Sequence, residues 1–341
     1  MRTVEMVLPG VGEPESLEAR ERELAAPEAG EARIRMAATG VSFAERSMRR
    51  GKYYQQPAFP LVPGYDVVGT VEELGAGAPA GLAVGDRVAA LTKTGGWARH
   101  VVLPAADLVP VPAAVSSVAA ETVIVNGLTA LRVLRRTRAV AGDTIVVFAA
   151  AGGVGSVLVQ LAVAAGIRVI GTAGPTQQQR LRSLGVIPID YRSEDVLARV
   201  RALAPDGVTA VVDNVGGPGI RDSWRLVRRG GALIALSDLT VMEARYPLVP
   251  FMRLYLRLKA WDLLPNGRRA QFFDLWAGHR RIEAFRAELR TDLTTLFGML
   301  ADGSLTAPVD SEYPLSRTAE AMRRAEGGGL AGKVVIVPDL N

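Results

Sequence analysis

The strongest constraint in this sequence is a glycine loop between a short apolar strand and an apolar helix. The segment TIVVFAAAGGVGSVLVQLA places Gly152, Gly153 and Gly155 between a predicted strand at 144–149 and a predicted helix at 154–165. Glycines let the backbone turn tightly and approach a pyrophosphate, whose charge binds the free N–H groups at a helix start. The loop therefore predicts a dinucleotide site. The alternative is a tight turn that only packs the helix on the strand.

Strands and helices alternate on both sides of this loop. Further short runs rich in Val and Ile are RVIGT at 168–172, VTAVVDN at 208–214 and ALIALS at 232–237, with helical segments between them. Such alternation, with uncharged strands, is typical of a doubly wound parallel sheet with helices on its faces. We expect residues 121–265 to form this Rossmann domain, so the fold class is α/β.

The first part of the chain, residues 1–120, has a different pattern. Its short apolar runs are separated by Gly and Pro and fall at 32–36, 66–73, 86–91 and 97–103. Runs below helical length between turn residues indicate a β-rich barrel or sandwich. The closing run KVVIV needs a sheet to join, so we expect residues 291–341 to return to this first domain.

The residues after the glycine loop bear on the choice of nucleotide. NAD-binding folds usually carry Asp or Glu about 20 residues beyond the glycines, where it holds the ribose 2′-hydroxyl. No acidic residue lies between Gly155 and Ile189, whereas Arg180 and Arg182 do. Guanidinium groups without a carboxylate suit a 2′-phosphate, so the pattern favours NADP(H). The alternative is that both arginines are solvated helix residues.

Composition excludes several kinds of chemistry. The chain has no cysteine and two histidines, His100 and His279, which are far apart. This removes disulfides, thiolate nucleophiles and zinc sites with sulfur ligands, and it argues against a histidine-rich metal site or a Ser-His-Asp hydrolase. We therefore predict no metal, and we interpret both histidines as structural or surface residues.

Charge is concentrated in one part of the sequence. The 40 basic and 35 acidic residues give a net charge of +5. Residues 243–290 alone supply this excess, which argues against a general nucleic-acid partner. The start of the chain has no apolar run typical of a signal sequence or a membrane span, so a cytoplasmic location is the expectation.

Ordered motifs along most of the chain resemble the medium-chain dehydrogenase/reductase superfamily, in particular its zinc-independent quinone oxidoreductase and enoyl reductase branch, which is zeta-crystallin-like. The resemblance implies a GroES-like catalytic domain, a Rossmann domain, a cofactor cleft between them and a homodimer. The motifs are TGVSFAERSMRRGKY (39–53), PGYDVVGTVEELGAG (63–77), VGDRVAAL (84–91), NGLTA (126–130), AAAGGVG (149–155), IDYRSED (189–195), DNVGG (213–217), RRGGALIALS (228–237) and GKVVIVP (332–338).

The same resemblance implies a set of residues that bind NADP(H). Those at the pyrophosphate are Ala151, Gly152, Gly153 and Val154. Those around the 2′-phosphate are Gly174, Gln177 and Tyr191, with Arg180 as a substitute donor because Gln177 stands where relatives have lysine. Those along the ribose and nicotinamide are Thr129, Asn214, Val215 and Ser237, and Lys333 matches a position near the cofactor.

Two residues of the first domain are the catalytic candidates. Tyr53 matches the RxGxY position and is our first choice to donate a hydrogen bond or a proton; the alternative is that it only lines the pocket. Ser42 replaces the asparagine usual in this family, as Glu45 replaces the aspartate, and its hydroxyl is the second candidate.

These residues suit hydride transfer without a metal. Alcohol oxidation benefits from a Lewis acid, whereas reduction of a conjugated double bond or a quinone needs only hydrogen-bond donors for the developing oxyanion. We therefore predict an NADPH-dependent reductase acting on an α,β-unsaturated carbonyl, with polyketide tailoring as one role, or on a quinone. The alternatives are a general quinone oxidoreductase without a dedicated substrate and a low-turnover NADPH-binding structural or membrane-associated protein.

Residues 241–290 are predicted to form a helical insert, longer than in the simplest quinone reductases and similar to the synaptic-vesicle membrane-protein branch. It has three open interpretations: a cap over an enlarged cleft for a polycyclic substrate, an amphipathic surface for an anionic membrane, or a structural excursion that makes subunit contacts. The aromatic and basic residues concerned are Phe251, Tyr255, Trp261, Phe272, Phe273, Trp276 and Phe285, with Arg253, Arg257, Arg268, Arg269, Arg280 and Arg281.

Overall fold

A computed structural model describes residues 1–339, apart from the side chain at position 242, and the chain divides into two compact units. Unit 1 comprises residues 1–128 and 278–341, and unit 2 comprises residues 129–277. The chain thus leaves the first unit and returns to it, and the predicted α/β architecture with a β-rich part and a parallel sheet is confirmed. The long helix α2 (Ser117–Thr137) crosses the boundary in the sequence.

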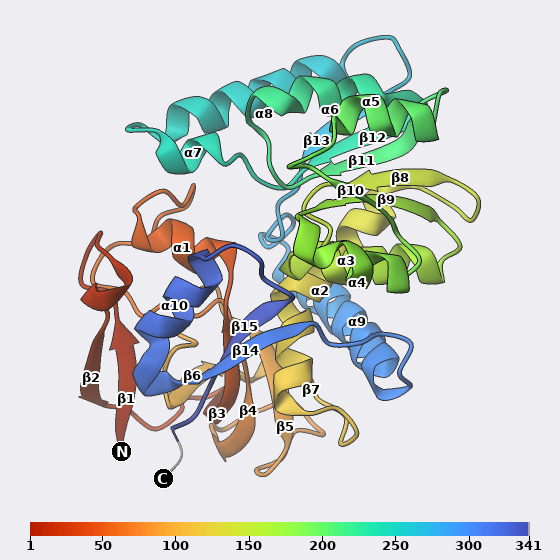
Figure 1. Cartoon of the computed structure of the whole chain (residues 1–341). Coiled ribbons are helices and arrows are strands. Elements are labelled where there is room, and N and C mark those ends of the chain that lie inside the picture. The colour runs from red at the N-terminus through yellow and green to blue at the C-terminus, as the bar shows by residue number, and fades with distance from the viewer. Residues whose placement is uncertain (340–341) are drawn as a thin grey trace. The chain divides into compact units, whose positions relative to one another are not determined.

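Unit 2 contains a parallel sheet of six strands in the order β10-β9-β8-β11-β12-β13 (Figure 1). Helices α3 and α4 lie on one face of this sheet, and α5, α6 and α8 lie on the other (Figure 1). The elements are β8 (Thr144–Val147), α3 (Gly153–Ala164), β9 (Arg168–Ala173), α4 (Gln178–Ser183), β10 (Ile187–Asp190), α5 (Val196–Leu203), β11 (Val208–Asp213), α6 (Ile220–Leu226), β12 (Val227–Ala235), α7 (Thr240–Glu243), α8 (Leu248–Asp262) and β13 (Arg269–Phe272).

The central strands of this sheet are buried on both faces, which explains their uncharged sequences. Ile145, Val146 and Val147 of β8 are fully buried, as are Val211 and Val212 of β11. Burying apolar side chains of this size stabilises a fold by about 1.5–3 kcal/mol each. The uncharged, β-branched sequences of these strands thus match their burial on both faces. The glycine loop follows directly after β8, one of these central strands.

The segment 241–290 is not the helical insert that we predicted. After α7 and α8 the chain forms β13, which pairs in parallel with β12 and continues the alternation of helix and strand. This four-residue strand is hard to recognise in the sequence, because only Ala270 in it is fully buried and an arginine precedes that residue. The segment is therefore mostly a regular crossover of the parallel sheet.

Several aromatic side chains of this segment belong to the interior. Trp261 stacks on Trp224, with ring centroids 5.3 Å apart and planes 3° from parallel. Phe251 meets Phe272 edge to face at 5.3 Å, and Phe273 is 6% exposed. These contacts favour the structural interpretation for these rings, since they pack on other side chains of unit 2.

Unit 1 is built on strands in the order β14-β15-β3-β4-β5-β7, with β6 also paired to β3 and with β1 and β2 as a separate hairpin. The pairs are antiparallel except for β14 with β15. The elements are β1 (Arg2–Val7), β2 (Glu18–Glu23), β3 (Glu31–Val41), α1 (Phe43–Arg49), β4 (Asp66–Leu74), β5 (Arg87–Leu91), β6 (His100–Pro104), β7 (Val109–Pro110), α9 (Ile282–Ala301), β14 (Val309–Pro314), α10 (Thr318–Glu326) and β15 (Lys333–Val337).

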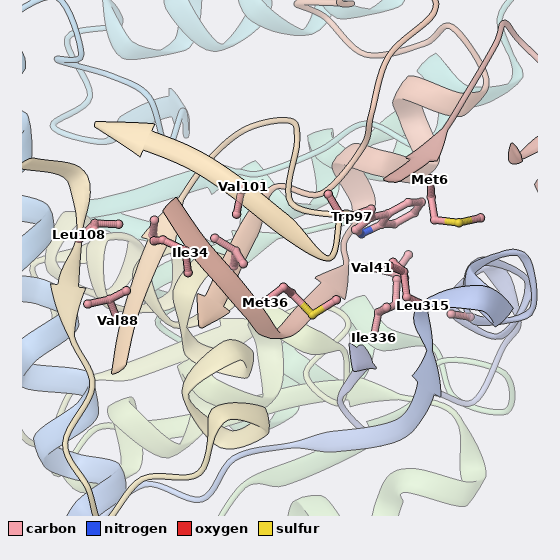
Figure 2. Close-up of a cluster of buried hydrophobic side chains, with 14 of the residues drawn as sticks. Met6, Ile34, Met36, Val41, Val88, Trp97, Val101, Leu108, Leu315 and Ile336 are labelled. Carbon is pink, nitrogen blue, oxygen red and sulfur yellow. The ribbon is translucent and has the colours of Figure 1, made fainter. Parts of the chain in front are cut away.

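The core of unit 1 joins residues from both of its chain segments. Figure 2 shows Ile34 and Met36 of β3 with Trp97 and, from the C-terminal segment, Leu315 and Ile336. Strand β15 pairs with β3, so the prediction that the closing strand returns to the first sheet is confirmed. One described helix, α2, is long and apolar enough to cross a membrane by composition, and 72% of that window is buried in the protein.

Candidate cofactor and active site

The glycine loop of unit 2 leads directly into helix α3. Strand β8 ends at Val147, and Ala149 then takes a φ of 53°, the left-handed conformation that turns the chain. Thr172 of β9 fixes this turn, because its hydroxyl accepts a hydrogen bond from Ala149 N at 3.1 Å and its carbonyl accepts one from Ala150 N at 2.9 Å. The loop is thereby held against the neighbouring strand.

The start of α3 has the properties of an anion site. Its N-cap is Gly152, which offers no side-chain acceptor to the first N–H groups of the helix. At Gly155 a Cβ would lie 2.3 Å from the carbonyl oxygen of Ala149, so only glycine lets the helix approach the loop this closely. The predicted pyrophosphate residues Ala151, Gly152, Gly153 and Val154 all lie on this turn.

The carboxyl ends of β9 and β10 bring further predicted residues together. Gly174 follows β9, and a Cβ on it would lie 3.9 Å from the hydroxyl of Tyr191 and 3.9 Å from Nε of Arg192. Gln177 precedes α4, and Arg180 lies within it. Arg192 is not among the predicted cofactor residues, although it stands beside Tyr191 in the IDYRSED motif. A cationic donor beside Gly174 fits a 2′-phosphate.

The loops after β11 and β12 hold the predicted nicotinamide-side residues. Asn214 donates from Nδ2 to the carbonyl of Phe148 at 3.0 Å, and the Ser237 hydroxyl donates to the carbonyl of Asn214. Asp213, which is 2% exposed, accepts from the N–H groups of Val215 and Gly216 at 2.8 Å each. Hydrogen bonds to Asp213 thus shape the turn that carries Asn214 and Val215.

These unit 2 residues form one coherent set. The loops after β8, β9, β11 and β12 all lie at the carboxyl edge of the parallel sheet, where open α/β sheets bind nucleotides. This edge fits a phosphorylated dinucleotide. It offers an uncapped helix start at Gly152, the glycine turn before it, and Arg192 at the place where NAD-binding folds carry an acidic residue. Thr129, on α2, is the remaining predicted residue of unit 2 and is 7% exposed.

In unit 1, Tyr53 forms a hydroxyl pair with Tyr65. Their oxygens lie 2.7 Å apart, and the rings meet edge to face with centroids 6.3 Å apart. Burial, followed by the charge and hydrogen bond of Tyr65, raises the pKa of Tyr53 above its ordinary value. Tyr53 therefore stays protonated and can act as a hydrogen-bond donor. Tyr65, which is 4% exposed, was not identified from the sequence, because no local pattern connects it to Tyr53.

Ser42, the other catalytic candidate, caps helix α1. Its Oγ accepts from Ala44 N at 3.1 Å and also bonds to Oε2 of Glu45, which accepts from Ser42 N at 2.8 Å. Glu45 also accepts from the backbone N–H of Tyr65 at 2.7 Å, so it links the start of α1 to the segment that carries Tyr65. The structure thus gives Ser42 a capping role, and its catalytic role stays a prediction.

Lys333 lies in a buried cluster with two carboxylates of unit 1. Its Nζ is 2.6 Å from Oδ2 of Asp66 and 2.5 Å from Oε1 of Glu121, and all three side chains are 1% exposed or less. Although burial alone lowers the pKa of Lys333, Asp66 and Glu121 raise it above its usual range. The ammonium group therefore neutralises buried carboxylates inside unit 1. That Lys333 also lies near the cofactor stays a prediction.

Comparisons with known proteins agree with this arrangement. A family model described as "Alcohol dehydrogenase GroES-like domain" matches residues 28–113, and one described as "Zinc-binding dehydrogenase" matches residues 184–336. Together they cover most of both units, and the chain belongs to the medium-chain dehydrogenase/reductase superfamily. In residues 1–339, no group of three or more His, Cys, Asp or Glu side chains is placed to hold a metal ion.

Individual relatives show which proteins the chain is similar to. The chain is 29% identical over 342 residues to the human synaptic vesicle membrane protein VAT-1 homolog, covering 98% of this chain and 86% of that protein. It is 28% identical to a mycocerosic acid synthase-like polyketide synthase of Mycobacterium tuberculosis, covering 95% of this chain and 15% of that protein. The solved quinone oxidoreductase of Escherichia coli complexed with NADPH superposes with a TM-score of 0.86, at 26% identity, over 98% of this chain and 100% of that chain. Other similar proteins are named as quinone oxidoreductases.

Proposed function

We propose that this protein is an NADPH-dependent reductase that acts on an α,β-unsaturated carbonyl compound or a quinone. The observation that carries the proposal is the carboxyl edge of the unit 2 sheet. An uncapped helix start stands at the glycine loop, and Tyr191 and Arg192 flank Gly174 where NAD-specific folds carry an acidic residue. The relative solved with NADPH supports the same cofactor.

The residues that hold the cofactor follow from this geometry. The N–H groups at the start of α3 bind the pyrophosphate, and Arg192 binds the 2′-phosphate together with Tyr191. Asn214 and Ser237 shape the loops along the nicotinamide side. When bound, NADPH supplies a hydride from its nicotinamide to an electron-poor carbon.

The side chains of unit 1 supply the hydrogen bonding. Reduction of an enone or quinone moves negative charge onto the carbonyl oxygen, and a fixed donor stabilises that oxyanion. Tyr53 is the donor, since its raised pKa keeps the hydroxyl protonated and Tyr65 orients it at 2.7 Å. The cysteine-free sequence offers no sulfur ligands, so we assign the oxyanion stabilisation to Tyr53 rather than to zinc.

A panel of acceptors tests the proposal. Oxidation of NADPH and of NADH is followed with simple quinones, linear enones and polycyclic enones. We expect acceptor-dependent oxidation with NADPH at a kcat/KM at least about tenfold above that with NADH, because the 2′-phosphate adds charge-assisted hydrogen bonds. Faster turnover with NADH contradicts the choice of cofactor.

The acceptor panel also separates the alternatives. Reduction of quinones alone, with enones untouched, favours a general quinone oxidoreductase. Tight NADPH binding without turnover of any acceptor favours a low-turnover NADPH-binding protein and refutes the reductase. The partial match to a polyketide synthase supports an enone as the substrate class.

Association with a membrane or a second subunit is a separate proposal, carried by the outward face of α8. Leu248, Met252 and Leu256 stand four residues apart and are 61%, 45% and 60% exposed, and an apolar row of this kind marks an interaction surface. Flotation with anionic liposomes and sedimentation in solution distinguish the two partners. A variant with Leu248 and Leu256 changed to Gln is expected to lose whichever association the native protein shows.

A further inference from the structure

Unit 2 contains a pocket beside the loops just described. It has a volume of about 370 Å³ and lies where the turn η4 (Gly217–Gly219) faces helices α7 and α8. This volume falls in the lower range of small-molecule sites. Most of the wall is apolar and consists of Pro218, Ala244, Val249, Pro250 and Leu254.

Two arginines make the remaining wall strongly basic. Arg253 and Arg257 stand four residues apart on α8, so both guanidinium groups project on one side of the helix. Like charges at this spacing repel each other and weaken a helix. Neither arginine has a hydrogen bond or an ion pair with any other described residue of the chain.

The acidic residue in the same wall makes no ion pair with either arginine. Asp238 also lines the pocket, and its Oδ1 accepts three hydrogen bonds from the loops after β11 and β12. The donors are Gly217 N at 3.1 Å, Thr240 N at 3.0 Å and the Thr240 hydroxyl at 2.6 Å. The pocket therefore combines apolar walls with two positive charges that lack a partner in the part of the chain that the structure describes.

The pocket adjoins the predicted nicotinamide side. Asp238 directly follows Ser237, and the N–H of Leu239 donates to the carbonyl of Val215 at 3.0 Å. A Cβ on Gly216 would lie 2.7 Å from the carbonyl oxygen of Ser237, so the two loops are in close contact. The pocket wall is therefore continuous with the loops that carry Asn214, Val215 and Ser237.

We propose that this pocket binds an anionic group, a carboxylate or a phosphate, at the end of an apolar chain, and that this chain is the distal part of the reductase substrate. Paired guanidinium groups bind such oxyanions through charge-assisted hydrogen bonds, and the apolar wall takes the methylene groups. The assignment of the ligand as substrate rests on the proposed reductase function, whereas anion binding itself does not.

A binding experiment tests the pocket without any turnover. Octanoate, octyl phosphate and octanol are titrated into the native protein by calorimetry, and then into the double variant R253Q/R257Q. We expect at least one of the two anions to bind the native protein about tenfold more tightly than octanol, and that difference to vanish in the double variant. The anion that binds more tightly identifies the head group. Equal affinity of octanol and both anions overturns the proposal.

A kinetic experiment tests the link to the substrate. Linear enones with the same reactive end and a terminal carboxylate, phosphate or methyl ester are compared by kcat/KM with NADPH. We expect the preferred anion to exceed the ester by about tenfold in the native protein and to lose that advantage in R253Q/R257Q, with the ester unchanged.

A surface lysine of the same helix provides the matched control. Lys259 lies over the ring of Tyr255 at 5.6 Å and is not part of the pocket wall. The variant K259Q removes one positive charge and is expected to keep the preference for the anion. If K259Q loses the preference for the anion as fully as R253Q/R257Q does, the proposal is overturned, because general attraction by the positive charge of the helix then explains the preference. If none of the enones, charged or neutral, and none of the quinones is reduced, the reductase proposal fails, while the calorimetric result for the pocket stands by itself.

Discussion

Replacing Lys333 with Met is expected to destabilise unit 1 strongly. The lysine lies between Asp66 and Glu121 at 2.6 and 2.5 Å, and all three side chains are buried. Without the ammonium group, two carboxylates remain in the interior with no cation beside them. Breaking a buried ion pair in this way costs about 3–5 kcal/mol, against a typical total free energy of unfolding of about 5–15 kcal/mol.

The cost of K333M is expected to grow with pH. Burial raises the pKa of Glu121 well above its ordinary value, and burial followed by the charge of Asp66 raises the pKa of Glu45. A carboxyl group with a raised pKa in the folded state favours folding below its unfolded pKa, near 4.5, and this contribution is lost as the pH rises through the folded pKa. Removing Lys333 raises these pKa values further, so the loss of stability is larger at about pH 8 than at about pH 5.

Urea denaturation at both pH values measures these effects. Lys93 is the control position, since its Nζ bonds to exposed Gln55, and K93M is expected to stay within about 0.5 kcal/mol of the native protein. The double variant E121Q/K333M is expected to be more stable than K333M, because one orphaned carboxylate is gone. A K333M protein within about 1 kcal/mol of the native protein at both pH values refutes this reasoning.

Three further predictions concern the candidate site. Arg192→Ala is expected to raise the Kd of NADPH by about tenfold and leave that of NADH unchanged, as measured by fluorescence titration; equal changes for both contradict the 2′-phosphate assignment. Tyr53→Phe is expected to lower kcat by about a hundredfold and Tyr65→Phe by less, in steady-state assays, because Tyr65 only orients the donor; an unchanged rate for Tyr53→Phe makes it a pocket residue. Gly155→Ala is expected to destabilise unit 2 by about 1–3 kcal/mol in denaturant unfolding, because its Cβ would lie 2.3 Å from the carbonyl oxygen of Ala149. Gly152→Ala is the control and is expected to cost less, because its Cβ would lie 3.3 Å from that oxygen.

The elements that the sequence predicts correctly are those whose determining pattern is local. The strand β8, the glycine turn and helix α3 are consecutive in the chain, so apolar runs and glycines sufficed to place them. The same holds for the alternation of strands and helices that follows. Strand β13 was missed, because its four residues are flanked by arginines and aromatic residues and are defined mainly by pairing with β12.

Residues defined by distant partners were harder to predict. Tyr65 orients Tyr53 from 12 positions away, and Asp66 meets Lys333 across 267 positions. Neither partnership leaves a periodic trace in the sequence. Lys333 was consequently assigned to the cofactor by resemblance alone, whereas the structure places its ammonium group between two buried carboxylates. Arg192 was overlooked for a different reason, since the arginines of α4 lay nearer to the glycine loop in the sequence.

The central claim is that this protein transfers a hydride from NADPH to an electron-poor carbon. Isotope transfer tests it most directly: a linear enone is reduced with NADPH deuterated on one or the other face of nicotinamide C4, and the product is analysed by mass spectrometry. We expect one deuterium on the product carbon from one of the two labelled cofactors and none from the other. Reduced product without deuterium from either labelled cofactor contradicts hydride transfer from NADPH.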